Sequence, residues 1–316
     1  MTPSVSVILC TYNGAKYLVE QIDSILSQTY PIHELILQDD GSTDATADIC
    51  RRYAAQFPQV RFYQNARNLG FNLNFKSAAM KATGDYVAIS DQDDVWFAEK
   101  IARQVEAIGA HDICFSTHTR GIDRENTRIV SPQYALEALL FGGFAGHTML
   151  LRRDFIQNEA NWIAHIHYDW SLALCAQMGK GIVRVDHPLN WHRLNDESAC
   201  AQEMKQHGTH NTPKPTYEPY LQGWTNYRRL QRTDNWQRLY RRIYDGTLRP
   251  DLRTAHRMAG LMLSPSPWAL LQLGWLCMKH RHKVYPDGGK GGIKGMVRGF
   301  FYPFIFAYNN IQYDLN

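Results

Sequence analysis

The sequence predicts an α/β protein in which an open, mostly parallel sheet with flanking helices is followed by a basic, mainly helical C-terminal region. Apolar runs of strand length alternate with amphipathic segments over the first 120 residues, which is the pattern of a sheet with crossover helices. From residue 221 to 316 the chain carries 15 Lys and Arg against 5 Asp and Glu, whereas residues 1–220 carry a net charge of −6. The two parts therefore have different surfaces and, we expect, different tasks.

The elements of the first part follow from the spacing of apolar residues. Val5–Cys10 is a continuous apolar run and predicts a buried strand. The next segment repeats apolar residues at helical spacing, at Leu18, Ile22, Ile25 and Leu26. Glu34–Gln38 predicts the second strand, and Ser42 or Thr43 is suited to cap the helix after it. Three further apolar runs predict strands, namely Val60–Tyr63, Tyr86–Ser90 and Asp112–Ser116.

Acidic side chains collect where the predicted strands end. They are Asp39 and Asp40 after the second strand, and Asp91, Asp93 and Asp94 after Ser90. Ligands of such sheets bind at the carboxyl ends of the strands. Carboxylates this close repel one another unless a cation or hydrogen-bond donors compensate their charge. Hard oxygen ligands suit Mg²⁺ or Mn²⁺, so the sequence predicts a divalent metal site at this edge.

Several classes of protein are disfavoured by what the sequence lacks. The turn Thr11–Lys16 has no spaced glycines for a dinucleotide, and no GxxxxGK[ST] loop occurs in the chain. The six cysteines form no CxxC pair, which favours a reducing compartment. Residues 1–6 lack the charged and apolar regions of a signal peptide, and no apolar run has the length of a bilayer span. We therefore expect a cytoplasmic protein.

Five sequence blocks together resemble the family 2 inverting glycosyltransferases of the GT-A fold, which transfer a sugar from a nucleotide donor. The blocks are Val5–Asn13, Gln38–Asp44, Asn68–Gly70 with Asn74–Phe75, Gly84–Tyr86 and Ser90–Trp96. The run Asp91–Trp96 together with His167–Trp170 is similar to the subgroup that contains many bacterial rhamnosyltransferases and other O-antigen or capsule enzymes. The resemblance covers roughly residues 4 to 200 and fades after that.

The resemblance implies roles for residues around the nucleotide. Asp40 would hydrogen-bond the pyrimidine base, and Thr11 and Tyr12 would line the base and ribose. Asp91 and Asp93 correspond to the carboxylates of the DxD motif, with Asp91 toward the ribose and metal and Asp93 on the Mg²⁺ or Mn²⁺ ion. Three more residues of the matching blocks would border the nucleotide, namely Asn13, Asn68 and Gly70. Asp94 is a candidate helper of the metal site.

The general base and the diphosphate contacts are implied by later segments. Asp169 aligns with the acid that takes the proton from the acceptor hydroxyl, beside a helix start where an anion is stabilised. Relatives often carry Tyr-Arg-Gln-His after the catalytic helix. Here His192 takes the tyrosine position, Arg193 is kept and Asn195 takes the histidine position. His192 and Arg193 are the candidate diphosphate contacts.

Each assignment has a purely structural alternative. Asp39 and Asp40 suit a capped turn, the DxDD cluster suits a solvated loop, and Asp169 suits a helix cap. For the whole chain, the alternative to an enzyme is a catalytically silent nucleotide-sugar-binding scaffold of a polysaccharide assembly complex. A scaffold has no need of a base, so Asp169 beside Asp40 and Asp93 argues against it.

The expected domain division is a catalytic domain at 1–200, with halves at about 1–116 and 117–200, a linker or loop at 201–220 and a basic helical region at 221–316. Aromatic residues beside cations in this last region suit the surface of an anionic membrane, while packing on the catalytic domain or in a homo-oligomer is the alternative. No nucleic-acid-reading motif accompanies the charge. The expected protein is peripheral on the inner face of the bacterial cytoplasmic membrane. It would use dTDP-L-rhamnose or a UDP-hexose and a lipid-linked saccharide acceptor.

Overall fold

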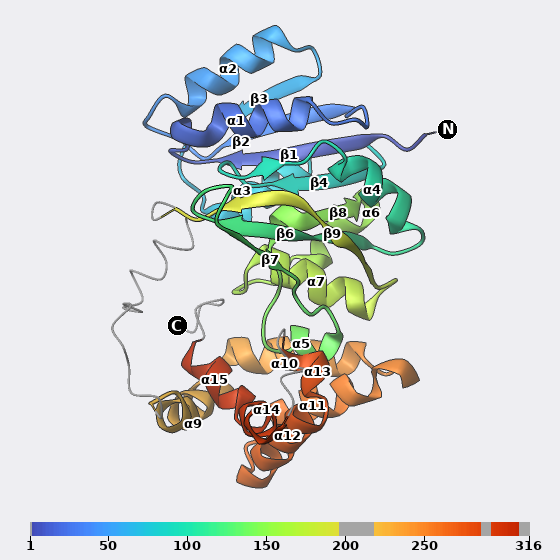
Figure 1. Ribbon diagram of the computed structural model, residues 1–316. Helices are drawn as coiled ribbons and strands as arrows, with labels where there is room; N and C mark the ends of the chain where they lie inside the picture. Colours follow the sequence, from blue (N-terminus) through green and yellow to red (C-terminus); the bar gives the residue numbers. More distant parts are fainter. Residues whose placement is uncertain (1, 196–217, 286–291, 310–316) are drawn as a thin grey trace. The chain divides into compact units, whose positions relative to one another are not determined.

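A computed structural model of the chain describes residues 2–195, 218–285 and 292–309 (Figure 1). Its internal contacts divide it into two compact units. The first unit comprises Met1–Ser131, Ala145–Trp162 and Gly179–Asn195, and the second comprises Pro132–Phe144, Ile163–Met178 and Asp196–Asn316. Two short segments from the middle of the chain thus belong with the C-terminal helices.

The first unit is built on a sheet of nine strands in the order β3-β2-β1-β4-β8-β6-β9-β5, with β7 paired to β6. The strands of its first half are β1 (Val5–Thr11), β2 (Glu34–Asp39), β3 (Val60–Gln64) and β4 (Tyr86–Ser90). All neighbouring pairs in this half are parallel. Every residue of β1 and β2 is buried, as expected for central parallel strands.

The second half of the sheet mixes both strand directions. Its strands are β5 (Val95–Trp96), β6 (Ile113–Gly121), β7 (Thr127–Val130), β8 (Met149–Arg152) and β9 (Ile182–Arg193). β8 runs antiparallel to both β4 and β6, whereas β9 is parallel to β6 and antiparallel to β5. The expectation of parallel strands therefore holds for the first half, and antiparallel pairs enter at β8.

Helices connect the strands of the first unit: α1 (Ala15–Leu26), α2 (Thr46–Gln56), α3 (Phe71–Ala79), α4 (Lys100–Ile108) and the short α6 (Arg153–Ile156). The apolar face predicted for α1 is buried at Leu18, Ile22 and Ile25 in a core with β1 and β2. The predicted cap of α2 is wrong, because the N-cap is Ala45. Ser42 instead donates its hydroxyl to Asp39 at 2.5 Å, which removes it from the helix start.

The second unit is helical. Its helices are α5 (Leu136–Leu139), α7 (Tyr168–Met178), α9 (Glu218–Gln231), α10 (Asp234–Gly246), α11 (Arg253–Leu263), α12 (Pro267–Lys279), α13 (Arg281–Val284), α14 (Gly292–Phe300) and α15 (Tyr302–Tyr308). Its core contains the fully buried side chains of Trp170, Trp236 and Tyr240. The Trp170 indole donates to the Leu139 carbonyl and the Tyr240 hydroxyl to the Leu140 carbonyl, each at 2.7 Å. These bonds tie α5 and α7 to the C-terminal helices.

The α/β class with a helical C-terminal region is confirmed. The expected division at 200 stays a prediction, and residues 201–217 of the expected linker 201–220 lie outside the described residues. Residues 218–220 belong to α9. None of the helices described is long and apolar enough to cross a bilayer.

Candidate active site

The carboxyl ends of β1, β2 and β4 meet at one edge of the first unit's sheet. Thr11 at the end of β1 is aligned with Asp39 at the end of β2, and Leu9 is aligned with Ser90 of β4. Asp91 and the following acids thus begin beside the end of β1. Parallel strands put these side chains together, as the sequence predicted for acids at strand ends.

Asp39 and Asp40 are both buried and have different partners. The Asp39 carboxylate accepts hydrogen bonds from Thr11 at 3.0 Å, from Ser42 and from Gln64 at 3.0 Å. The Asp40 carboxylate accepts from the Asn65 amide group and from the backbone N–H groups of Leu69 and Gly70, at 2.8 to 2.9 Å. Asp39 therefore stabilises the turn after β2, and Asp40 holds the loop before α3.

Gln92 joins the DxD loop to the end of β1. Its side-chain amide accepts from the Tyr12 N–H at 2.9 Å and donates to the Tyr12 carbonyl at 3.1 Å. A Cβ atom at Gly14 would lie 2.1 Å from Gln92 Oε1, so this contact requires glycine. Asn13 has a positive φ of 47° and accepts from the Thr43 N–H at 2.9 Å. The three strand ends are thus connected by side-chain hydrogen bonds, while half of the Tyr12 side chain stays exposed.

Asp93 carries a negative charge that the protein compensates only in part. Its carboxylate accepts from the Asn195 side-chain amide at 2.5 Å. Burial, together with the neighbouring charge of Asp94, raises the pKa of Asp93 above its ordinary value despite this bond. Asn195 therefore contacts the Asp93 carboxylate from the residue after β9 and Leu194.

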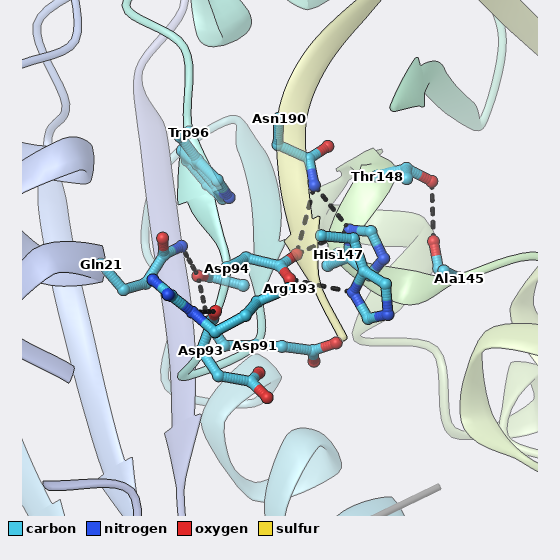
Figure 2. Close-up of polar contacts among 12 residues, drawn as sticks. Gln21, Asp91, Asp93, Asp94, Trp96, Ala145, His147, Thr148, Asn190 and Arg193 are labelled. Atoms are coloured by element: carbon cyan, nitrogen blue, oxygen red, sulfur yellow. Dashed lines mark hydrogen bonds and ion pairs between the residues drawn. The ribbon is translucent and has the colours of Figure 1, made fainter. Parts of the chain in front are cut away.

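Asp94 has the most buried carboxylate of the loop and lies in a network of histidines (Figure 2). Oδ1 lies 2.9 Å from His192 Nδ1, and Oδ2 lies 2.9 Å from His147 Nδ1. The Asn190 amide donates to Oδ2 at 3.2 Å. The two imidazole rings stack with centroids 4.8 Å apart, and His118 lies edge-on to both.

Charge and tautomer in this network follow from the carboxylate. Burial disfavours the ionised form of Asp94, but the two imidazoles outweigh it and hold the pKa well below its usual range. An ionised carboxylate only accepts hydrogen bonds, so Nδ1 of His147 and of His192 carries the proton. The Asn190 amide nitrogen, 2.9 Å from His147 Nδ1, then donates to Asp94 and not to that ring. Burial lowers the pKa of His147 and lowers that of His118 to about 2. For His192, burial is outweighed by the bond to Asp94, which raises the pKa.

Nε2 is the ring nitrogen of His192 that the Asp94 bond leaves for other partners. His192 is part of a group with Asp94 and His147 whose potential metal-ligand atoms lie within 4.8 Å of one another. The Nε2 atom of His147 and the Oδ1 atom of Asn190 are buried and have no hydrogen-bond partner among the described residues. The network thus combines satisfied bonds around Asp94 with two buried polar atoms that no described residue satisfies.

Arg193 is held by the protein on several sides. One NH₂ group donates to Glu20 at 2.5 Å, and Nε donates to the Asp93 carbonyl at 3.2 Å. The guanidinium lies 4.4 Å from the ring centroids of both Tyr17 and Trp191. Its position beside the DxD loop is therefore fixed by α1 and β9.

Sequence reasoning missed the roles of His147, Asn190 and Lys100 in this site. Lys100 is fully buried, donates to the His147 carbonyl at 2.9 Å and lies over the Trp96 ring. Burial lowers the pKa of Lys100 to about 7. His147 precedes β8, and because β8 is antiparallel to β4, its start lies at the carboxyl end of β4. The signal that the sequence offered was a histidine two residues before a short apolar strand.

The residues expected in the site are divided between the two units. Those in the first unit are Thr11, Tyr12, Asn13, Asp40, Asn68, Gly70, Asp91, Asp93, His192 and Arg193. Asp169 lies in the second unit, at the second position of α7. Its Oδ1 accepts from the Trp170 N–H at 2.7 Å, and Trp170 is fully buried. The helix expected to begin beside Asp169 is present.

Comparisons with known proteins bear on this architecture. Residues 6–169, just over half of the chain, match the model of glycosyl transferase family 2. The chain is 35% identical over 114 residues to TuaG of Bacillus subtilis (strain 168), whose name describes a glycosyltransferase of teichuronic acid biosynthesis. This match covers 36% of the chain and 45% of TuaG, and the chain spans less than half the length of the curated relatives it matches.

Two solved structures share the fold. S. aureus TarS in complex with UDP-GlcNAc has a TM-score of 0.56 and 17% identity, with 98% of this chain and 93% of that chain covered. The mannosyltransferase PcManGT from Pyrobaculum calidifontis, in complex with GDP-Man and Mn²⁺, has a TM-score of 0.51 and 18% identity, with 96% and 86% covered. At these identities the likeness concerns the fold alone.

Proposed function

Because the chain belongs to glycosyl transferase family 2, we propose that it transfers a hexosyl residue from a nucleotide sugar to a hydroxyl group of a lipid-linked glycan. The process served is bacterial surface polysaccharide synthesis, as for an O-antigen or capsule, and the name of TuaG supports this. The observation that carries the proposal is the convergence of Thr11, Asp40 and the Asp91–Asp93 loop at one sheet edge within the matched residues.

The donor is a pyrimidine nucleotide sugar, either dTDP-L-rhamnose or a UDP-hexose. Thr11, Tyr12 and Asp40 would hold the base and ribose, with Asn13, Asn68 and Gly70 at the border of the nucleotide. Support comes from the exposed Tyr12 side chain beside the buried Asp40, and from Asp40's bond to the Gly70 N–H, which shapes the neighbouring loop. TarS was solved with UDP-GlcNAc, which is consistent with a UDP sugar.

The end of β4 fits a divalent cation. Burial and the neighbouring charge of Asp94 raise the pKa of Asp93, and carboxylate oxygens of Asp91 and Asp93 suit Mg²⁺ or Mn²⁺. The structure of PcManGT contains Mn²⁺ together with GDP-Man. When bound, such an ion would act as a Lewis acid and stabilise the charge of the departing nucleoside diphosphate.

His192 and Arg193 are proposed to contact the diphosphate. Asp94 fixes the His192 tautomer through Nδ1, which directs Nε2 to other partners. The raised pKa of His192 favours the imidazolium, whose Nε2–H donates to phosphate oxygen. Arg193 has five N–H donors, more than its bonds to Glu20 and Asp93 use.

Asp169 is proposed to be the general base of an inverting transfer. It would accept the proton of the acceptor hydroxyl as that oxygen attacks the anomeric carbon from the face opposite the leaving group. Its position in the first turn of α7 supports a carboxylate that stays ionised, because the helix N-terminus stabilises an anion. A lipid-linked acceptor fits a protein peripheral on the inner face of the cytoplasmic membrane.

Calorimetry with a panel of nucleotide sugars, in Mn²⁺ and in EDTA, tests this function. We expect one pyrimidine nucleotide sugar to bind in Mn²⁺, with affinity lower by on the order of 10² in EDTA. Asp93→Ala should lose the same factor in Mn²⁺. Asp48→Ala, which removes an exposed acid of α2 that pairs with Arg51, is the control. Equal affinity with and without metal would refute the metal role, and binding of no sugar would refute the donor site.

A further inference from the structure

Helix α12 exposes an apolar face that a folded unit ordinarily covers. Trp268, Leu271 and Trp275 recur at spacings of three and four residues, so they lie on one side of the helix. The exposed fractions are 73% for Trp268 and 47% for Trp275. The opposite side of α12, including Leu270, Leu273 and Cys277, is buried. Large exposed aromatic residues arranged as a stripe mark an interaction surface.

Helix α14 carries a second stripe of this kind. Ile293, Met296 and Val297 are exposed, with Ile293 at 80%, whereas Gly295 and Gly299 face the interior of the unit. Lys294 and Arg298 of this helix are also exposed, and the Arg298 guanidinium lies over the Tyr285 ring, 5.6 Å from its centroid. Both helices therefore present apolar residues that the described part of their unit leaves exposed.

The two helices pack side by side through glycines (Figure 1). A Cβ atom at Gly274 would lie 2.7 Å from the Phe300 carbonyl oxygen, and one at Gly299 would lie 3.0 Å from Met278 Cα. The contacts run antiparallel, because Tyr285, beyond the end of α12, donates to the Gly295 carbonyl near the start of α14. An α-helix turns by ~100° per residue. Viewed along its own axis from the N- to the C-terminus, each helix carries its exposed stripe on the same side of the line along which it contacts the other helix. In an antiparallel pair, both stripes then open on the same side. We refer to them together as the α12–α14 face.

Cations predominate around this face, although Lys283 lies 3.7 Å from the Glu137 carboxylate of α5. Residues 267–285 and 292–300 contain no Asp or Glu. They contain five Lys and Arg residues, namely Lys279, Arg281, Lys283, Lys294 and Arg298. Lys279 lies over the Trp275 ring, 5.2 Å from its centroid. A Trp beside a Lys is the pair that suits the boundary between acyl chains and anionic headgroups.

We propose that the α12–α14 face docks on the surface of an anionic phospholipid bilayer. Its apolar stripes would enter the headgroup boundary, and its cations would lie at the phosphate level. A second copy of the chain is disfavoured as the occupant, because a two-fold contact would set like cations against one another. The α12–α14 face would be the part of the chain that contacts the membrane in the proposed function. The docking rests on that function only in that the acceptor is lipid-linked.

Flotation of the full chain with vesicles tests the proposal. We expect binding to phosphatidylcholine vesicles that contain 30% phosphatidylglycerol, and little binding to phosphatidylcholine alone. A Trp268→Ser and Trp275→Ser double variant should bind at least 10-fold more weakly. A Lys279→Gln, Lys294→Gln and Arg298→Gln triple variant should lose about 100-fold, since each cation near such a surface contributes about fivefold.

Controls separate this proposal from the sugar-transfer function. Ile122→Ser with Ile129→Ser removes two exposed apolar residues of the first unit and should float like the wild type. Nucleotide-sugar affinity should be the same in the docking variants and the wild type. Wild type that binds sugar but floats with neither vesicle overturns the docking face alone. Flotation without sugar binding overturns the donor site alone. Dimers lost in the Trp double variant, with no flotation, would instead identify a contact between copies.

Discussion

The Asp94 network in the first unit and the α12–α14 face in the second depart in opposite ways from ordinary burial. Asp94, His147 and Asn190 are polar and buried, whereas Trp268 and Ile293 are apolar and exposed. Burying a charge costs free energy unless hydrogen-bonded partners compensate it. Exposing an apolar stripe to water also costs free energy, which is recovered when the stripe is covered. The first arrangement suits the charged ligand proposed for the sheet edge, and the second suits the bilayer surface proposed for the α12–α14 face.

The difference also concerns rigidity. The carboxylates at the ends of β2 and β4 are tied to several neighbours by hydrogen bonds, so their geometry is set before a ligand binds. On α12 the exposed Trp275 ring is contacted by the Lys279 ammonium, and a lipid surface does not require a fixed geometry. If this contrast is correct, changes in the first unit act on the donor, and changes in the second act on the acceptor side.

The largest expected effect comes from Asp169→Asn in the second unit. We expect turnover to fall by ~10² to 10⁴ while donor affinity is nearly unchanged, because the variant keeps the size of the side chain and removes a general base. Initial rates at saturating donor, with calorimetry of donor binding, measure both quantities. Asp154→Asn is the matched control, because Asp154 accepts from the next residue's N–H at 2.9 Å just as Asp169 does. Wild-type turnover in Asp169→Asn would leave Asp169 as a helix residue only.

A smaller effect is expected from Asp94→Asn in the first unit. The amide is a weaker acceptor than the carboxylate and does not fix both imidazole Nδ1–H groups, so donor affinity in Mn²⁺ should fall ~10- to 100-fold. The ring ¹⁵N shifts of His147 and His192 should change with it, which a purely structural loss would not require. Asp112→Asn is the control, a buried acid bonded to the Lys180 N–H. Unchanged affinity and ring shifts would contradict the positioning role.

The sequence was sufficient where the information is local. The apolar run of β4 predicted a strand, and the spacing of Leu18, Ile22 and Ile25 predicted α1 with its buried face. The site assigned to the acids after β4 stays a prediction. Asp91 and Asp93 came from the same local pattern. These features depend on residues within one strand, one helix or one turn, so the sequence order alone was enough.

The remainder of the site depends on pairings between distant strands. His147 and Asn190 reach Asp94 because β8 runs antiparallel to β4 and β9 pairs with β5. Neither pairing can be predicted from the apolar pattern of a single strand. The antiparallel pairing of β8 with β4 also differs from the parallel sheet that the sequence predicted. Ser42 shows a local failure, since it was expected to cap α2 but is bonded to Asp39.

The smallest expected effect comes from a comparison of two lysines, one in each unit. Lys100 is buried in the first unit, whereas Lys279 is exposed on α12. Burial lowers the pKa of Lys100 to about 7, against about 10.4 in the unfolded chain. Between these values the unfolded state binds more protons, so the contribution of Lys100 to stability rises with pH. Lys100→Met removes this dependence, and the free energy of unfolding of the wild type relative to the variant should increase by up to ~1.4 kcal/mol per pH unit between pH 7 and 10.

Urea unfolding of wild type and variant at pH 7.5, 8.5 and 9.5 measures this slope as a difference, in which the titration of the buried cysteines cancels. Lys279→Met, which removes an exposed lysine of α12, is the matched control. A difference that is constant across the three pH values would mean that Lys100 keeps its proton when buried. The first unit would then hold a permanent cation beside Asp94, and charge in the network would be balanced by Lys100 as well as by the histidines.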